Sequence, residues 1–290
     1  MMRYGEDMQR YKIVHRTYYN YANDVTLGPH NLLLRPREDH ELRIESLTLN
    51  ISPNASLLWH RDVEGNSVAI ATFDTSTSQL AIESEVIIQQ YNKDPLDFLV
   101  ADYAVNYPFT YQTEDEILLS PYMALPETLT VDVVRRWIAN FWRSPEQIQT
   151  YSLLQRLAEF INEKMVYRVR EEPGVQSARR TLSCGTGSCR DFAWLFMEAA
   201  KCLGLASRFV SGYLHAPLMG DEIGATHAWA EVYLPGAGWK GFDPTIGKIV
   251  GSDHIAVAVA RLPESIPPVA GSYAGASNSS LDVGVWVSKY

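Results

Sequence analysis

The stretch Ser183-Cys184-Gly185-Thr186-Gly187-Ser188-Cys189-Arg190-Asp191-Phe192-Ala193-Trp194 decides the fold of the second half of the chain. Its two glycines allow a tight loop. Ser188 is a favourable helix N-cap, and Asp191 lies three residues later, at the position of the acidic residue in a capping box. The pattern predicts a helix that begins at Cys189, runs to Leu203 and is followed by Gly204.

Cys189 would occupy the first position of this helix. The helix dipole and the free backbone N–H groups of the first turn favour a thiolate there, and the same N–H groups can bind the oxyanion of an attacked carbonyl. These properties suit a thiol nucleophile, although a small buried cysteine that follows an N-cap would show the same sequence. Arg190 could support the thiolate or form an ion pair elsewhere, and Asp191 is interpreted as a cap rather than a catalyst.

The chain contains three cysteines, which is too few and the wrong number for a framework of disulfides. Cys202 falls on the apolar stripe of the predicted helix, so we expect it in the core. Cys184 fits either a packed loop residue or a resolving thiol. The spacing lacks a second cysteine pair and a His-x3-His motif, so no zinc site, and no other metal or cofactor, is expected.

A hairpin downstream brings a histidine and a carboxylate together. Residues 226–234 alternate, 235–238 are typical of a turn, and 239–243 return as a second strand. A turn centred on residue 235 places His227 opposite Asp243, where the carboxylate would fix the imidazole tautomer and stabilise the imidazolium. Either residue alone fits a structural role. His254 opens a later strand, and there a structural role is expected.

The surrounding sequence indicates two domains. Residues 1–115 contain short alternating segments separated by turns, typical of an all-β sandwich-like or barrel domain. Residues 116–290 predict helices followed by an antiparallel sheet, an α+β arrangement. The helices are expected at 129–142, 144–165 and 189–203, and the strands at 208–214, 226–234, 239–243, 255–259 and 283–287. Residues 263–280 are rich in Pro, Gly and Ser and predict a long surface loop.

The composition is that of an ordinary globular chain. Of 290 residues, 46% are hydrophobic and 20% are charged, which excludes a disordered chain. The net charge of −9 argues against nucleic acid as a partner. No segment approaches the roughly 18 apolar residues of a membrane span, and the N-terminus lacks a signal-peptide pattern. We therefore expect no membrane association and a cytoplasmic location, while the oligomeric state stays open.

Four motifs together resemble the transglutaminase-like superfamily. They are Gly185-Thr-Gly-Ser-Cys189-Arg-Asp-Phe-Ala193, Gly204-Leu-Ala-Ser-Arg208-Phe-Val-Ser-Gly212-Tyr213, Thr226-His227-Ala-Trp-Ala-Glu-Val-Tyr233 and Gly238-Trp-Lys-Gly-Phe-Asp243-Pro-Thr245. More narrowly, the chain looks like bacterial transglutaminase-like proteins described as cysteine proteases. The likeness covers about residues 120–290, and the first third resembles the β-rich domain that accompanies such catalytic domains.

The resemblance implies a papain-like catalytic core with a Cys-His-Asp triad. Carried over, Cys189 is the nucleophile, His227 the base and Asp243 its orienting acid. The implied activity is thiol-dependent acyl transfer on amide bonds of a protein or peptide through a thioester. We expect hydrolysis by a cysteine protease or amidase, with a transglutaminase, a deamidase or a non-catalytic scaffold as alternatives. The tryptophan that eukaryotic members use for the oxyanion has no evident counterpart, and Tyr167 is a substitute candidate.

Overall fold

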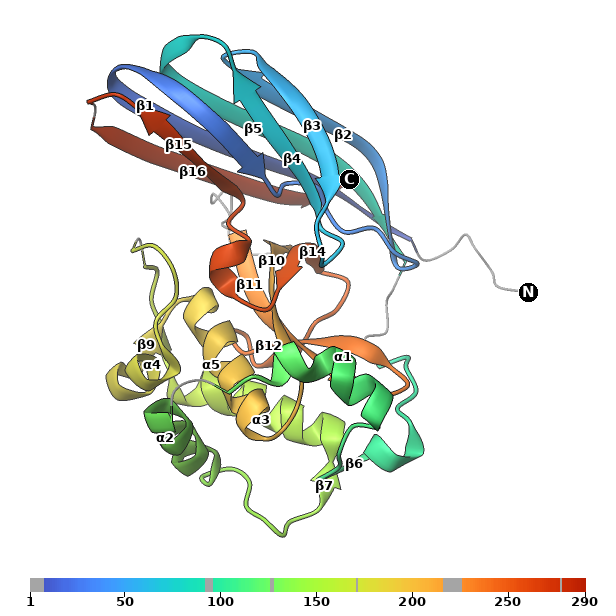
Figure 1. Ribbon diagram of the computed structural model, residues 1–290. Coiled ribbons are helices and arrows are strands. Elements are labelled where there is room, and N and C mark those ends of the chain that lie inside the picture. The colour runs from blue at the N-terminus through green and yellow to red at the C-terminus, as the bar shows by residue number, and fades with distance from the viewer. Residues whose placement is uncertain (1–7, 92–95, 126–127, 171, 216–225, 277) are drawn as a thin grey trace.

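A computed structural model describes residues 8–91, 96–125, 128–170, 172–215, 226–276 and 278–290. It shows a β-rich domain above a mixed domain of helices and a sheet (Figure 1). The predicted fold class, α+β with an all-β N-terminal domain, is confirmed.

The β-rich domain is one sheet organised around a very long first strand. The N-terminal half of this strand lies between β5 and β16, and its C-terminal half lies between β4 and β15. A register shift between Asn20 and Val25 separates the two halves. The bent sheet encloses its own apolar cluster, which includes Leu32, Leu80 and Ile82. Its strands are β1 (Gln9–Leu32), β2 (Leu42–Ser52), β3 (Ala55–Arg61), β4 (Ser67–Phe73), β5 (Ser76–Gln90), β15 (Val269–Ala274) and β16 (Ser279–Lys289).

The C-terminal strands belong to this first sheet. The sequence placed the last strand with the catalytic domain in 116–290, but β16 pairs with β1 from Tyr11 to Tyr21. The predicted loop over 263–280 contains a 3-10 turn, η2 (Pro263–Ser265), and strand β15. Strand partners distant in sequence leave no local signal, because alternation sets which face of a strand is buried and not which sheet it joins.

One helix of the second domain begins later in the chain than expected. The helix predicted from residue 144 begins at Thr150, because Ile148 and Gln149 pair with β6 instead of joining the helix. Thr150 is held there by its hydroxyl, which donates to the carbonyl of Ala104 at 2.6 Å. No helix was predicted at α1 or α4. The helical elements are η1 (Asp102–Ala104), α1 (Thr113–Met123), α2 (Thr128–Ile138), α3 (Thr150–Lys164), α4 (Ala178–Cys184) and α5 (Cys189–Cys202), and the short pair is β6 (Asn106–Tyr107) with β7 (Ile148–Gln149).

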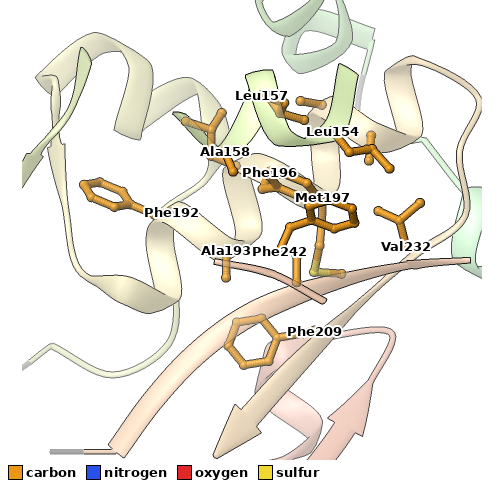
Figure 2. Packing of buried hydrophobic residues seen from close by; sticks show 14 of the residues in the cluster. Leu154, Leu157, Ala158, Phe192, Ala193, Phe196, Met197, Phe209, Val232 and Phe242 are labelled. Carbon is orange, nitrogen blue, oxygen red and sulfur yellow. The ribbon is translucent and has the colours of Figure 1, made fainter. Parts of the chain in front are cut away.

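The second sheet has five strands in the order β13-β12-β11-β10-β14. Helix α5 packs on one face of this sheet, as the close view of the core shows (Figure 2). Phe196 of α5 stacks on Phe242 of the sheet with 5.6 Å between ring centroids, and both are fully buried. Removing either ring would cost about 3–5 kcal/mol. The strands are β10 (Ser207–Leu214), β11 (Thr226–Leu234), β12 (Gly238–Asp243), β13 (Lys248–Ile249) and β14 (His254–Ala260).

The N-terminal domain is fastened to edge strand β14. The buried side chain of Asn66 donates to the carbonyl of Val259 at 2.8 Å and accepts from the Val259 N–H at 2.9 Å. The Arg37 N–H donates to the carbonyl of Ala256 at 2.9 Å. Such bonds to buried backbone fix the strand position closely.

Within the described residues, no single helix has the length and apolar character to cross a membrane, and only the bent pair of α1 and α2 meets that criterion when the two are taken together.

Candidate active site

The glycines of the first motif are required by the backbone that leads to α5. Gly185 follows α4 with a φ of +66°, a left-handed conformation that favours glycine. Gly187 lies so close to α5 that a Cβ on it would sit 2.8 Å from the Cβ of Asp191. Between them runs β9 (Thr186–Gly187), which pairs in parallel with β8 (Val166–Tyr167). The helix therefore begins at Cys189, as predicted.

Asp191 fixes the start of this helix. Its Oδ2 accepts hydrogen bonds from the backbone N–H of Ser188 at 2.8 Å and from the Ser188 hydroxyl at 2.9 Å. Its Oδ1 accepts from Arg170 at 2.8 Å and from the N–H of Gln176 at 2.7 Å. Burial alone would raise the pKa of this carboxyl, but these bonds outweigh burial and lower it. The prediction that Asp191 is a cap is confirmed.

The structure brings the three predicted site residues together. His227 Nε2 lies 2.6 Å from Asp243 Oδ2. Cys189 acts on the same imidazole, because it contributes to raising the pKa of His227. Cys189 is 8% exposed and Asp243 is fully buried. The result is a buried cluster of a thiol, an imidazole and a carboxylate.

The register of the hairpin differs by one residue from the prediction. Ala230 pairs with Phe242 and Leu234 with Gly238, so the turn is centred on residue 236. Asp243 then falls opposite Trp229, and His227 is its diagonal neighbour on the same face. Diagonal positions are close enough for long side chains to meet, so the direct pairing was wrong while the predicted contact is confirmed.

His254 is a member of the cluster that sequence reasoning missed. Its Nε2 lies 3.1 Å from Asp243 Oδ2, so the carboxylate is shared by two histidines. The other carboxylate oxygen accepts the backbone N–H of Thr245 at 2.8 Å. His254 lies on β14, which pairs with β10 and not with β12. The sequence offered no local signal beyond a histidine at the start of a strand.

The surroundings of His227 favour the protonated form of its imidazole. Burial alone would lower the pKa of His227, but the hydrogen bonds and charges of Asp243 and Cys189 outweigh burial and raise it to about 10. Burial alone would raise the pKa of Asp243, but the two histidines hold it well below its usual range. At neutral pH His227 is therefore an imidazolium, the form that stabilises a neighbouring thiolate.

Three further candidates from the sequence lie outside this cluster: Arg190, Cys184 and Cys202. Arg190 donates to the carbonyls of Arg170 and Glu172 at 3.1 and 3.2 Å, so it braces the preceding loop. Cys184 ends α4 and is exposed, which differs from the packed loop position considered above. Cys202 packs partly buried against the core, and burial raises its pKa to about 11.

Tyr167 of β8 lies near the thiol. It is 48% exposed, and its ring meets that of Phe192 edge-on with 6.4 Å between centroids. Burial and then the charge of Cys189 raise the pKa of its phenol. Tyr167, the candidate for a second oxyanion donor, therefore lies on the strand that pairs with Gly187, two residues before Cys189.

Three of these side chains also have the atom spacing of a metal site. The ligand atoms of His227, Asp243 and His254 lie within 4.8 Å of one another. The N–H of Gly251 donates to His254 Nδ1 at 3.3 Å, so Nε2 is the nitrogen that carries a proton and donates to the carboxylate. A metal would have to displace the hydrogen bonds of both histidines to Asp243.

A helix with a cysteine at its first residue, packed on an antiparallel sheet that presents a histidine, defines the papain-like fold class. Residues 142–244, which hold Cys189, His227 and Asp243, match the family model of the transglutaminase-like superfamily. Residues 11–89 match that of the bacterial transglutaminase-like N-terminal region. The chain belongs to the transglutaminase-like superfamily.

Relatives extend this match over nearly the whole chain. Uncharacterized proteins of Mycobacterium bovis and Mycobacterium tuberculosis are each 30% identical over 295 aligned positions, covering 95% of this chain and 91% of their own. A crystal structure of a candidate cysteine protease from Cytophaga hutchinsonii has a TM-score of 0.73, covering 98% of this chain and 91% of its own at 16% identity. This last likeness shows a shared two-domain fold.

Proposed function

We propose that this protein is a thiol-dependent enzyme that acts on amide bonds of a protein or peptide, chiefly as a hydrolase of the cysteine protease or amidase type. The observation that carries the proposal is the buried cluster of Cys189, His227 and Asp243, in which His227 Nε2 lies 2.6 Å from Asp243 Oδ2 and Cys189 contributes to raising the pKa of His227. Each of the three has the chemistry of one triad role: nucleophile, base and orienting acid.

The first half of the reaction forms a thioester. The thiol proton of Cys189 is held by His227, and the sulfur attacks the amide carbonyl, forming the S–C bond. Among the described residues, none accepts a hydrogen bond from the backbone N–H of Cys189, so this group is available to the oxyanion. When the tetrahedral intermediate collapses, the C–N bond breaks and His227 gives its proton to the leaving amine.

The second half of the reaction regenerates the thiol. Water attacks the thioester, His227 accepts a proton from the water, and the S–C bond breaks as the carboxylic acid leaves. The proton on His227 then restores the pair with Cys189. Asp243 stays ionised throughout and stabilises the imidazolium. If an amine attacks in place of water, the product is a new amide, which is the transglutaminase reaction named by the family.

The test is a search for the acyl donor that does not assume a substrate. The full chain is incubated with a peptide library, with and without a labelled primary amine, and intact-protein mass spectrometry reports acyl groups on Cys189. We expect a covalent adduct that disappears as free acid is released. Incorporation of the labelled amine would assign transamidation instead. A library that acylates the wild type no more than Cys189→Ala would contradict enzymatic function and favour the scaffold alternative.

A further inference from the structure

The carboxylate of Asp243 forms a hydrogen bond with a second histidine, His254. We propose that His254 is a positioning residue that keeps Asp243 ionised and oriented toward His227. The inference rests on the proposed function, because it assigns a role relative to that triad. The superfamily match ends at residue 244, ten positions before His254, so no comparison assigns this residue.

The surroundings of Asp243 require more than one hydrogen-bond donor. Its side chain is fully buried, and a buried carboxylate is stable only when its lone pairs are satisfied. Oδ1 accepts from Thr245, and Oδ2 accepts from both His227 and His254. The bond to His227 changes in strength as that ring gains and loses a proton, whereas His254 has no hydrogen bond to Cys189 among the described residues and can hold the carboxylate throughout.

The ring of His254 is itself held in one orientation. It is 6% exposed, and its Nδ1 accepts the N–H of Gly251 at 3.3 Å. Trp229 meets it edge-on with 5.2 Å between ring centroids, and the ring of His227 lies 6.1 Å away. Since Nδ1 is an acceptor, the proton of the neutral ring is on Nε2, where it points to Asp243.

The strand that carries His254 is fixed by the N-terminal domain. His254 is the first residue of β14, and the later residues Ala256 and Val259 form the backbone bonds to Arg37 and Asn66 described above. The N-terminal domain therefore sets the position of β14, and β14 in turn presents His254 to the carboxylate. This gives the N-terminal domain a structural link to the proposed triad.

Other charged groups share a pocket with His254. The pocket has a volume of about 320 Å³ and is lined by residues of both domains; the charged ones are Arg37, Asp39, Glu41, Arg208, Glu231 and Lys240. Arg208 and Glu231 are paired at 2.7 Å. Within the described part of the chain, none of these six forms a hydrogen bond or ion pair with Asp243. A change in Cys189 alkylation on replacing His254 would thus report the direct contact with Asp243.

The experiment compares His254→Phe, which removes the donor, with His254→Gln, whose amide nitrogen can replace Nε2–H. The readout is the alkylation rate of Cys189 by iodoacetamide, resolved by mass spectrometry, between about pH 4 and 9. His254→Phe should slow the reaction about 10- to 100-fold. Loss of the donor weakens the hold of Asp243 on the imidazolium that stabilises the Cys189 thiolate, so the acid limb of the profile, which reports thiolate formation, should move up by about one pH unit.

The rescue and the matched control separate positioning from packing. His254→Gln should restore most of the rate and the position of the acid limb. His15→Gln serves as the control, because His15 is buried at the domain interface and bonds Tyr213 at 2.8 Å without touching the triad. It should leave the profile unchanged. A Gln variant as slow as the Phe variant would show that only packing is involved and would overturn the inference.

The remaining outcomes distinguish the two proposals. If both His254 variants match the wild type while His227→Ala slows alkylation, the His254 role fails and the triad stands. If His227→Ala also matches the wild type, the proposed function fails. Should His254→Phe not fold, ¹⁵N NMR of the wild-type histidines decides: an unprotonated Nδ1 on His254 supports the inference, and a proton on Nδ1 at neutral pH overturns it.

Discussion

The helix side and the sheet side of the candidate site are assembled in different ways. On the helix side, Cys189 is positioned by Ser188 and Asp191, its neighbours in sequence. On the sheet side, His227, Asp243 and His254 come from β11, β12 and β14, so their meeting depends on strand pairing. The difference teaches that Cys189 is placed by local backbone signals, whereas His227, Asp243 and His254 are placed by the tertiary fold. Variants on the two sides should therefore fail in different ways.

The largest effect is expected from removing the nucleophile. Cys189→Ala should lower turnover of any amide substrate by about 10⁶-fold, the cost of deleting a covalent nucleophile. The protein should stay folded, because the side chain is small. Cys184→Ala is the matched control, since that thiol is exposed and lies outside the cluster, and it should retain full turnover. Equal turnover in the two variants would rule out thioester chemistry at Cys189.

The second-largest effect is expected on kcat, when the carboxylate on the sheet side is replaced. Asp243→Asn leaves the shape of the site unchanged but presents a neutral amide to His227, so the imidazolium loses its counter-charge. We expect kcat to fall about 10⁴-fold with substrate binding little changed. Steady-state kinetics on the substrate found by the library measures this. A loss confined to KM would mean that Asp243 contacts the substrate rather than orienting the base.

The corresponding change on the helix side should act on stability instead. Asp191→Asn removes a buried charge that accepts bonds from Ser188, Arg170 and Gln176, which should cost about 3 kcal/mol of unfolding free energy. The folded fraction should retain kcat within about tenfold, because Asp191 touches none of the proton-transfer groups. Denaturant unfolding together with active-site titration measures both. A full loss of kcat with unchanged stability would remove the distinction between the two sides.

A smaller effect concerns the dependence of stability on pH. The pKa of His227 is raised in the folded chain, so the stability that this group contributes is complete below its unfolded pKa of about 6.5. It is lost as the pH rises toward about 10. The difference in unfolding free energy between the wild type and His227→Gln should therefore shrink over that interval. A difference that grows with pH would contradict the imidazolium assignment.

The parts that could be predicted from the sequence are those with local causes. The start of α5 follows from Ser188, Asp191 and the two glycines, and the His227–Asp243 contact follows from a short hairpin. The one-residue error in register arose in the turn, whose backbone includes left-handed Gly236 and Gly238. A turn can hold a variable number of residues, and flanking alternation does not fix that number.

The parts that could not be predicted depend on pairings distant in sequence. His254 reaches Asp243 only because β14 lies at the edge beside β10, which precedes β11 in the chain. The C-terminal strands join the N-terminal sheet for a similar reason, since β16 pairs with β1 although the two strands lie at opposite ends of the sequence. In both cases the residues carry ordinary strand patterns, and the partner strand decides the outcome.

The central claim is that His227 activates Cys189, and competition among the three thiols tests it most directly. The wild type is treated with limiting iodoacetamide at about pH 5, and the alkylated cysteines are counted by mass spectrometry. Exposure alone favours Cys184, which is exposed, over Cys189, which is 8% exposed. We expect Cys189 to react first and to lose this advantage in His227→Ala. Preferential labelling of Cys184, unchanged by His227→Ala, would contradict it.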